Sequence, residues 1–81
     1  MEDKTVRDAF LDTVISQIES GDPPETKATY ERLMAEGHPR SHALQLIAAA
    51  LRVEMNRMMS EATPFDTGRY AALLEKIKAE G

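Results

Sequence analysis

The longest apolar-rich stretch of the chain is SHALQLIAAALRVEMNRMM, residues 41–59, and it contains neither glycine nor proline. On a helical wheel, at about 100° per residue, it shows a broad apolar stripe with the i, i+3, i+4 spacing typical of a helix that faces a core. The stripe consists of Leu44, Ile47, Ala48, Leu51, Met55, Met58 and Met59. Leu46, Ala49 and Val53 point to the opposite side, where they form a second apolar face. A helix that is apolar on two sides needs a partner on each side.

Two amphipathic segments precede this central helix. In residues 5–20, apolar side chains recur every four positions, which predicts a helix that ends at Gly21. A second helix is predicted over residues 23–36, because Asp22 suits its N-cap and Pro23 its first position. Glu25, three residues after the cap, completes a capping box. This second helix ends at Gly37, and a short turn leads into the central helix.

A fourth helix is predicted after the proline-containing loop that follows Met59. Asp66 suits its N-cap, and Phe65 is placed to pack on Tyr70 as a hydrophobic staple. The apolar stripe of this helix consists of Tyr70, Leu73, Leu74 and Ile77. No segment shows the alternation typical of a strand. We therefore expect an all-α fold: a small four-helix domain with a long central third helix, formed by residues 1–81 as a single domain.

The composition is typical of a folded domain, but the short chain predicts marginal stability unless another interaction adds to the core. The chain has 81 residues, of which 42% are hydrophobic and 30% charged. A domain of this size buries only about 60% of the surface that its unfolded chain exposes. There is no cysteine, so disulfides and thiolate metal sites are excluded. Oligomerisation is the remaining common source of stability.

The charge balance indicates where the protein works and what it binds. The net charge is −4 and the pI is about 5.1, whereas binding to nucleic acids or anionic membranes depends on an excess of Lys and Arg. The N-terminus carries no pattern of a signal peptide, and no apolar run is long enough to span a membrane. We therefore expect a soluble, cytoplasmic protein.

A family resemblance supports the helical interpretation. The run GDPPETKATYERLMAEGHPRSHALQLIAAAL and the later PFDTGRYAALLEKI resemble the C-terminal part of the bacterial family catalogued as domain of unknown function 1841. The likeness spans about residues 21–77, and the positions that carry it are Pro23, Pro24, Glu25, Leu33, Gly37, Ala43, Ile47, Phe65, Asp66, Tyr70 and Leu73. The resemblance implies an all-helical bacterial domain and brings no established activity.

Three ionisable residues, His38, His42 and Glu54, are candidate site residues. His38 and His42 have the four-residue spacing of two metal ligands on a helix, but Pro39 places His38 at or before the helix start. No third ligand follows from the sequence, so we expect surface or capping histidines and no metal. Glu54 lies between the two apolar faces of the central helix, and we expect a structural ion pair with Arg57.

A helix-turn-helix DNA-binding regulator is the alternative function. The second helix, Gly37 and the central helix resemble such a motif in order, with Arg40, Ser41, His42 and Gln45 as base-reading residues. A recognition helix of about twenty residues with two apolar faces is unusual, however, and the domain is acidic and lacks a basic surface. We therefore expect no nucleic-acid partner.

The remaining features do not specify a reaction. Met34, Met55, Met58 and Met59 are expected to fill an irregular core, although methionines also line adaptable grooves for partner helices. The sequence offers no nucleophile with a base partner and no glycine-rich phosphate loop. We expect no catalytic residue and no cofactor.

The sequence therefore predicts a small protein–protein interaction or structural domain. We expect it to form a homodimer, or to bind another protein, through the second face of the central helix. The predicted interface residues are Leu46, Ala49, Ala50 and Val53.

Overall fold

The computed structural model describes residues 2–77, and the side chains within residues 9–77. In this part of the chain there are four helices: α1 (Glu2–Ser20), α2 (Pro24–Ala35), α3 (Arg40–Glu61) and α4 (Thr67–Glu75). The described residues contain no strand. The predicted fold class, a small all-α domain with a long third helix, is confirmed.

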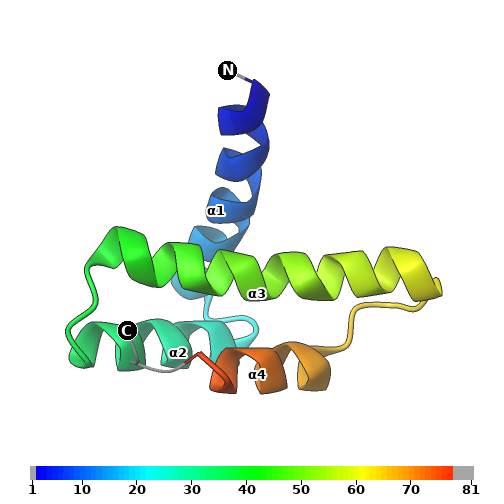
Figure 1. The fold of residues 1–81 in the computed structure, drawn as a ribbon. Coiled ribbons are helices and arrows are strands. Elements are labelled where there is room, and N and C mark those ends of the chain that lie inside the picture. Colours follow the sequence, from blue (N-terminus) through cyan, green and yellow to red (C-terminus); the bar gives the residue numbers. More distant parts are fainter. Residues whose placement is uncertain (1, 78–81) are drawn as a thin grey trace.

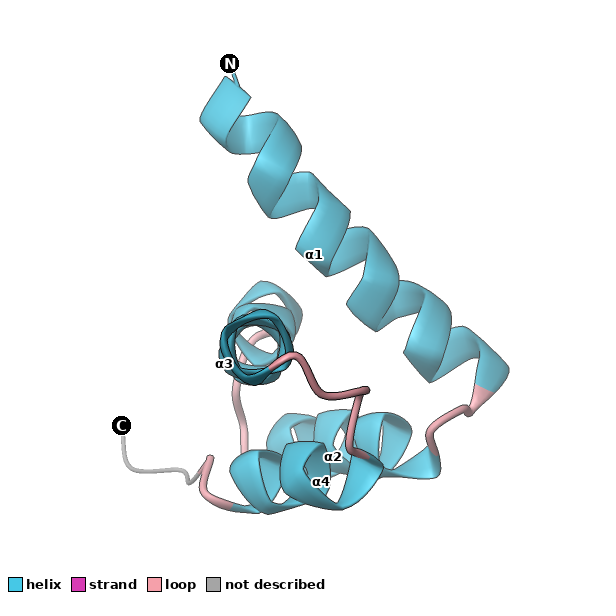
Figure 2. Cartoon of the chain, turned by 90° about the vertical axis from the view of Figure 1, so that its right-hand side faces the viewer, coloured by secondary structure: helices cyan, strands magenta, loops and turns pink. Residues whose placement is uncertain are grey.

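Helix α3 lies in the middle of the molecule. Figure 1 shows α2 and α4 on one side of α3, while α1 runs across it. The view along α3 in Figure 2 places α2 and α4 next to each other beneath α3 and α1 on a different side. Both α2 and α3 pack against each of the three other helices. The arrangement leaves one side of α3 uncovered by the other described helices, as Figure 2 shows.

The buried core is built around one face of α3. Its residues are Val14 from α1, Leu33 from α2, Ala43, Leu44, Ile47, Ala50 and Leu51 from α3, and Tyr70 and Leu74 from α4. Leu44, Ile47 and Leu51 belong to the stripe that the sequence assigned to the core. Half-buried side chains such as Phe10, Leu11 and Leu46 pack against this cluster from its edges.

The start of α2 differs from the prediction. The helix begins at Pro24, and Pro23 occupies the N-cap position with extended backbone (φ −77°, ψ 150°) and no side-chain cap. A residue that precedes a proline is disfavoured in helical conformation, so Pro24 keeps Pro23 outside the helix. The predicted capping box of Asp22 and Glu25 is therefore wrong. Pro39 is likewise extended and precedes the first residue of α3.

The predicted start of α4 is confirmed. The Asp66 Oδ1 atom accepts a hydrogen bond of 3.1 Å from the Arg69 N–H, as an N-cap side chain does. The rings of Phe65 and Tyr70 meet edge to face with centroids 5.5 Å apart, which gives the predicted hydrophobic staple. These two contacts fix the direction in which the chain enters α4.

We expect Asp66→Ala to lower the free energy of unfolding by about 1 kcal/mol, because the Arg69 N–H would lose its side-chain partner. Urea denaturation followed by circular dichroism measures this change. Thr67→Ala is the control, since Thr67 is exposed and is the first residue of α4. Equal stability of the two variants would show that the cap contributes nothing.

A buried polar network joins three helices, and nothing in the sequence pattern predicted it. The Gln17 Oε1 atom of α1 accepts hydrogen bonds from the Thr26 hydroxyl of α2 at 2.8 Å and from the Tyr70 hydroxyl of α4 at 3.1 Å. Thr26 and Tyr70 have no exposed surface. Burial raises the pKa of the Tyr70 hydroxyl above its usual value of 10.0, and the Thr26 hydroxyl, 3.4 Å from it, acts in the opposite direction. The network fixes how α1, α2 and α4 meet.

Candidate functional site

The second apolar face of α3 is largely outside the core. Ala49 is exposed and Val53 is 45% exposed, whereas Leu46 is half-buried against the edge of the core. Ala50 differs from the prediction, because it is buried with only 7% of its surface exposed. It lies three residues from Ile47, on the side of α3 that faces the core. We refer to Leu46, Ala49 and Val53 as the outer face.

The methionines are more exposed than the sequence suggested. Met34, Met55 and Met59 are 40%, 38% and 75% exposed, and Met58 is half-buried. The expectation that they fill the core is therefore wrong for these three. For Met55 and Met59, which lie on α3, the reason is length: at about 1.5 Å per residue, the 22 residues of α3 extend past the 12 of α2 and the 9 of α4. Figure 1 shows the end of α3 extending past α4.

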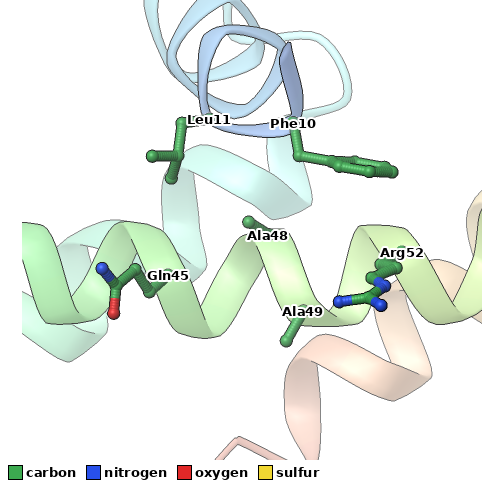
Figure 3. Close-up of a pocket in the computed structure, with 6 residues that line it drawn as sticks. All are labelled: Phe10, Leu11, Gln45, Ala48, Ala49 and Arg52. Atoms are coloured by element: carbon green, nitrogen blue, oxygen red, sulfur yellow. The ribbon is translucent and has the colours of Figure 1, made fainter. Parts of the chain in front are cut away.

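A groove lies beside the outer face, where α1 crosses α3. It has a volume of about 300 Å³ and is open to solvent. We call it the corner groove; its lining residues are Phe10, Leu11, Gln45, Ala48, Ala49 and Arg52. Figure 3 shows Phe10 and Leu11 extending from α1 on either side of Ala48, with Gln45 and Arg52 toward the two ends. The groove thus has an apolar middle and polar ends.

The two histidines meet, although His38 precedes the helix. Their Nδ1 atoms lie 3.2 Å apart, and their rings pack edge to face with centroids 5.1 Å apart. At this distance one imidazole donates a hydrogen bond and the other accepts it. Among the described residues, no group of three or more His, Cys, Asp or Glu side chains is arranged to hold a metal ion.

Glu54 is a buried carboxylate, but its partner is not the predicted one. Only 1% of its surface is exposed. Its Oε2 atom accepts a hydrogen bond of 3.2 Å from the Asp66 N–H at the start of α4, while its Oε1 atom has no hydrogen-bond partner among the described residues. Arg57 instead lies 3.8 Å from Glu61, on the exposed side of α3. Glu54 therefore connects α3 to α4, and the predicted pair with Arg57 is wrong.

The residues considered as base readers are all on the surface. Arg40, Ser41, His42 and Gln45 are exposed in the first two turns of α3. Gln45 also lines the corner groove, so one side of this set faces α1 rather than open solvent. The helix that carries them is 22 residues long and holds most of the core.

Over the described residues, none of the helices is both long and apolar enough to cross a membrane. Comparisons of the chain with protein-family models, with curated proteins and with solved structures gave no match.

Proposed function

We propose that this chain is a protein–protein interaction domain that forms a homodimer through the outer face of α3. The observation that carries the proposal is an apolar row, Leu46, Ala49 and Val53, that the other helices leave at least partly uncovered. Val53, at 45% exposure, is a large apolar side chain in solvent. A domain of 81 residues gains stability from covering such a row.

The spacing of the row suits two α3 helices packed along their length, and the arrangement proposed is an antiparallel pair. Its residues are separated by three and four positions, which keeps them on one line along a helix. With a two-fold axis close to Ala49, Leu46 of each copy faces the partner's Val53, and the small side chain of Ala49 lets the two helices approach closely. The role is binding rather than catalysis.

The exposed methionines are a second support for an interaction role. On α3, the helix that carries the row, Met55 and Met59 place flexible apolar side chains on the surface, and such side chains adapt to a protein partner. Single exposed apolar residues are ordinary on any protein, so the row on α3 carries the argument and the methionines add to it.

The proposal is tested by the mass of the protein in solution. We expect wild-type protein to have twice the 9.0 kDa mass of the chain and to keep it on dilution. Val53→Glu should raise the dissociation constant by at least about 100-fold, because two carboxylates lose water at a symmetric interface. Size-exclusion chromatography with light scattering over a dilution series measures both.

Met34→Glu is the matched control, because it introduces the same charge at an apolar residue of similar exposure on α2. This variant should remain a dimer. A wild-type protein that is a 9.0 kDa monomer at every concentration would refute the homodimer. So would a Val53→Glu protein that dimerises as tightly as wild type.

A further inference from the structure

The outer face alone is small for a stable dimer. Interfaces of stable complexes bury about 800 Å² on each partner, which is about 15% of the 5309 Å² surface of this domain. Of the three residues in the row, Leu46 is already half-buried and Ala49 is small. A homodimer of this chain therefore needs more surface than the row supplies, and that surface has to adjoin it.

The corner groove is the surface that adjoins the outer face. Ala49 belongs to both. The groove residues on α3 are Gln45, Ala48, Ala49 and Arg52, and their i, i+3, i+4, i+7 spacing marks the strip of a helix that lies under a second, packed helix. Residues of the outer face and the groove thus form one continuous strip along α3.

Helix α1 supplies a wall for this strip. Figures 1 and 2 show the N-terminal part of α1 running past α3, away from the other helices. Phe10 and Leu11 lie where α1 leaves α3, and both are half-buried in the chain while lining the groove. A helix laid along the strip would cover these two side chains as well as Ala48 and Ala49.

We infer that the occupant of the corner groove is α3 of a second copy, so that Phe10 and Leu11 of each chain cover the partner's α3. The inference rests on the proposed homodimer and gives its geometry. The row on α3 is a ridge of apolar side chains with a small residue at its centre. The groove is a concavity with alanines at its floor and polar side chains at its two ends. Since every chain has both the ridge and the groove, a two-fold axis places the ridge of each chain in the groove of its partner, and both contacts form twice in the dimer.

The helix dipoles favour the same antiparallel arrangement. In an antiparallel pair the positive end of each α3 lies beside the negative end of the partner's α3, whereas a parallel pair brings like ends together.

Two variants of the groove test the inference by sedimentation equilibrium. Phe10→Ala removes part of the wall, and Gln45→Trp fills the groove from an exposed position without changing the core. Each should raise the dissociation constant of the dimer at least about tenfold, since each change occurs twice in a symmetric interface. Leu73→Ala is the control for Phe10→Ala, because Leu73 is also half-buried against the core but lies on α4.

The outcomes separate the inference from the proposed function. If Val53→Glu dissociates a wild-type dimer while Gln45→Trp and a folded Phe10→Ala keep its dissociation constant, the outer face is the whole interface and the groove inference is overturned. If Phe10→Ala fails to fold by circular dichroism, Gln45→Trp decides alone. A loss of dimer in the groove variants, with Leu73→Ala still dimeric, is the result we expect. A monomeric wild type would overturn both.

Discussion

Tyr70→Ala is expected to lower the free energy of unfolding by about 3–5 kcal/mol, the range for removing a buried aromatic ring. Tyr70 is fully buried in the core and also packs against Phe65. Because a domain of 81 residues is stable by only about 4–12 kcal/mol in total, this single change removes a large share of the stability. Urea denaturation followed by circular dichroism measures the loss.

Tyr70→Phe separates the ring from its hydroxyl. This variant keeps the ring and removes the hydroxyl, with its 3.1 Å hydrogen bond to Gln17 and its 3.4 Å contact with the Thr26 hydroxyl. The Gln17 oxygen still accepts a hydrogen bond from Thr26. The expected cost is about 0.5–1.5 kcal/mol. If Phe were as damaging as Ala, the hydroxyl network and not the volume of the ring would hold the three helices together.

The same residue gives the domain a sensitivity to alkali. Burial raises the pKa of the Tyr70 hydroxyl in the folded protein, so the unfolded chain ionises first as pH increases. The stabilising contribution is complete below pH 10.0, the usual pKa, and is lost as pH rises through the folded value. Tyr70→Phe should therefore lose less stability than wild type between pH 9 and pH 11, as measured by thermal denaturation.

The helices were predictable because their signals are local. Gly21 and Gly37 adopt positive φ angles of 73° and 98°, which glycine reaches without strain, and α1 and α2 end where these glycines indicated. Asp66 and Phe65 likewise define the start of α4 through neighbours within five positions. The start of α2 was off by one residue because two consecutive prolines each satisfy the preference for the first helical position.

What the sequence could not supply is which side of α3 each neighbour covers. Periodicity placed Met55 and Met59 in the stripe of Ile47, but it holds no information on where α2 and α4 stop alongside α3. Ala50 lies near the border of the two predicted faces, and its burial depends on the position of those helices. The corner groove depends on the crossing of α1 over α3, which no local pattern encodes.

Polar contacts between segments far apart in the sequence could not be predicted for a similar reason. Gln17 and Tyr70 are 53 positions apart, and Glu54 meets the backbone of Asp66 across the loop between α3 and α4. A partner four or fewer residues away is the natural guess for a charged side chain on a helix. In the case of Glu54 that guess fails, because its side chain points into the domain and Arg57 points out of it.

Glu54→Lys is expected to lower the free energy of unfolding by about 3–5 kcal/mol, the cost of an uncompensated buried charge. In the wild type, the Glu54 carboxylate accepts a hydrogen bond from the Asp66 N–H at the positive end of α4. A lysine ammonium group cannot accept this hydrogen bond, because it has only donors, and its positive charge is repelled by the positive end of the helix dipole. The loss is measured by urea denaturation, and α4 should be the first helix to lose amide-exchange protection.

Glu54→Gln is the informative control, because it keeps an oxygen for the Asp66 N–H and removes the charge. The Oε1 atom of Glu54 is buried without a partner, so the carboxylate is less well satisfied than its burial requires. The amide should consequently leave stability within about 1 kcal/mol of wild type and preserve exchange protection at Asp66. If Gln were instead as destabilising as Lys, the negative charge itself would be what holds α4 against α3, and the hydrogen bond would be secondary.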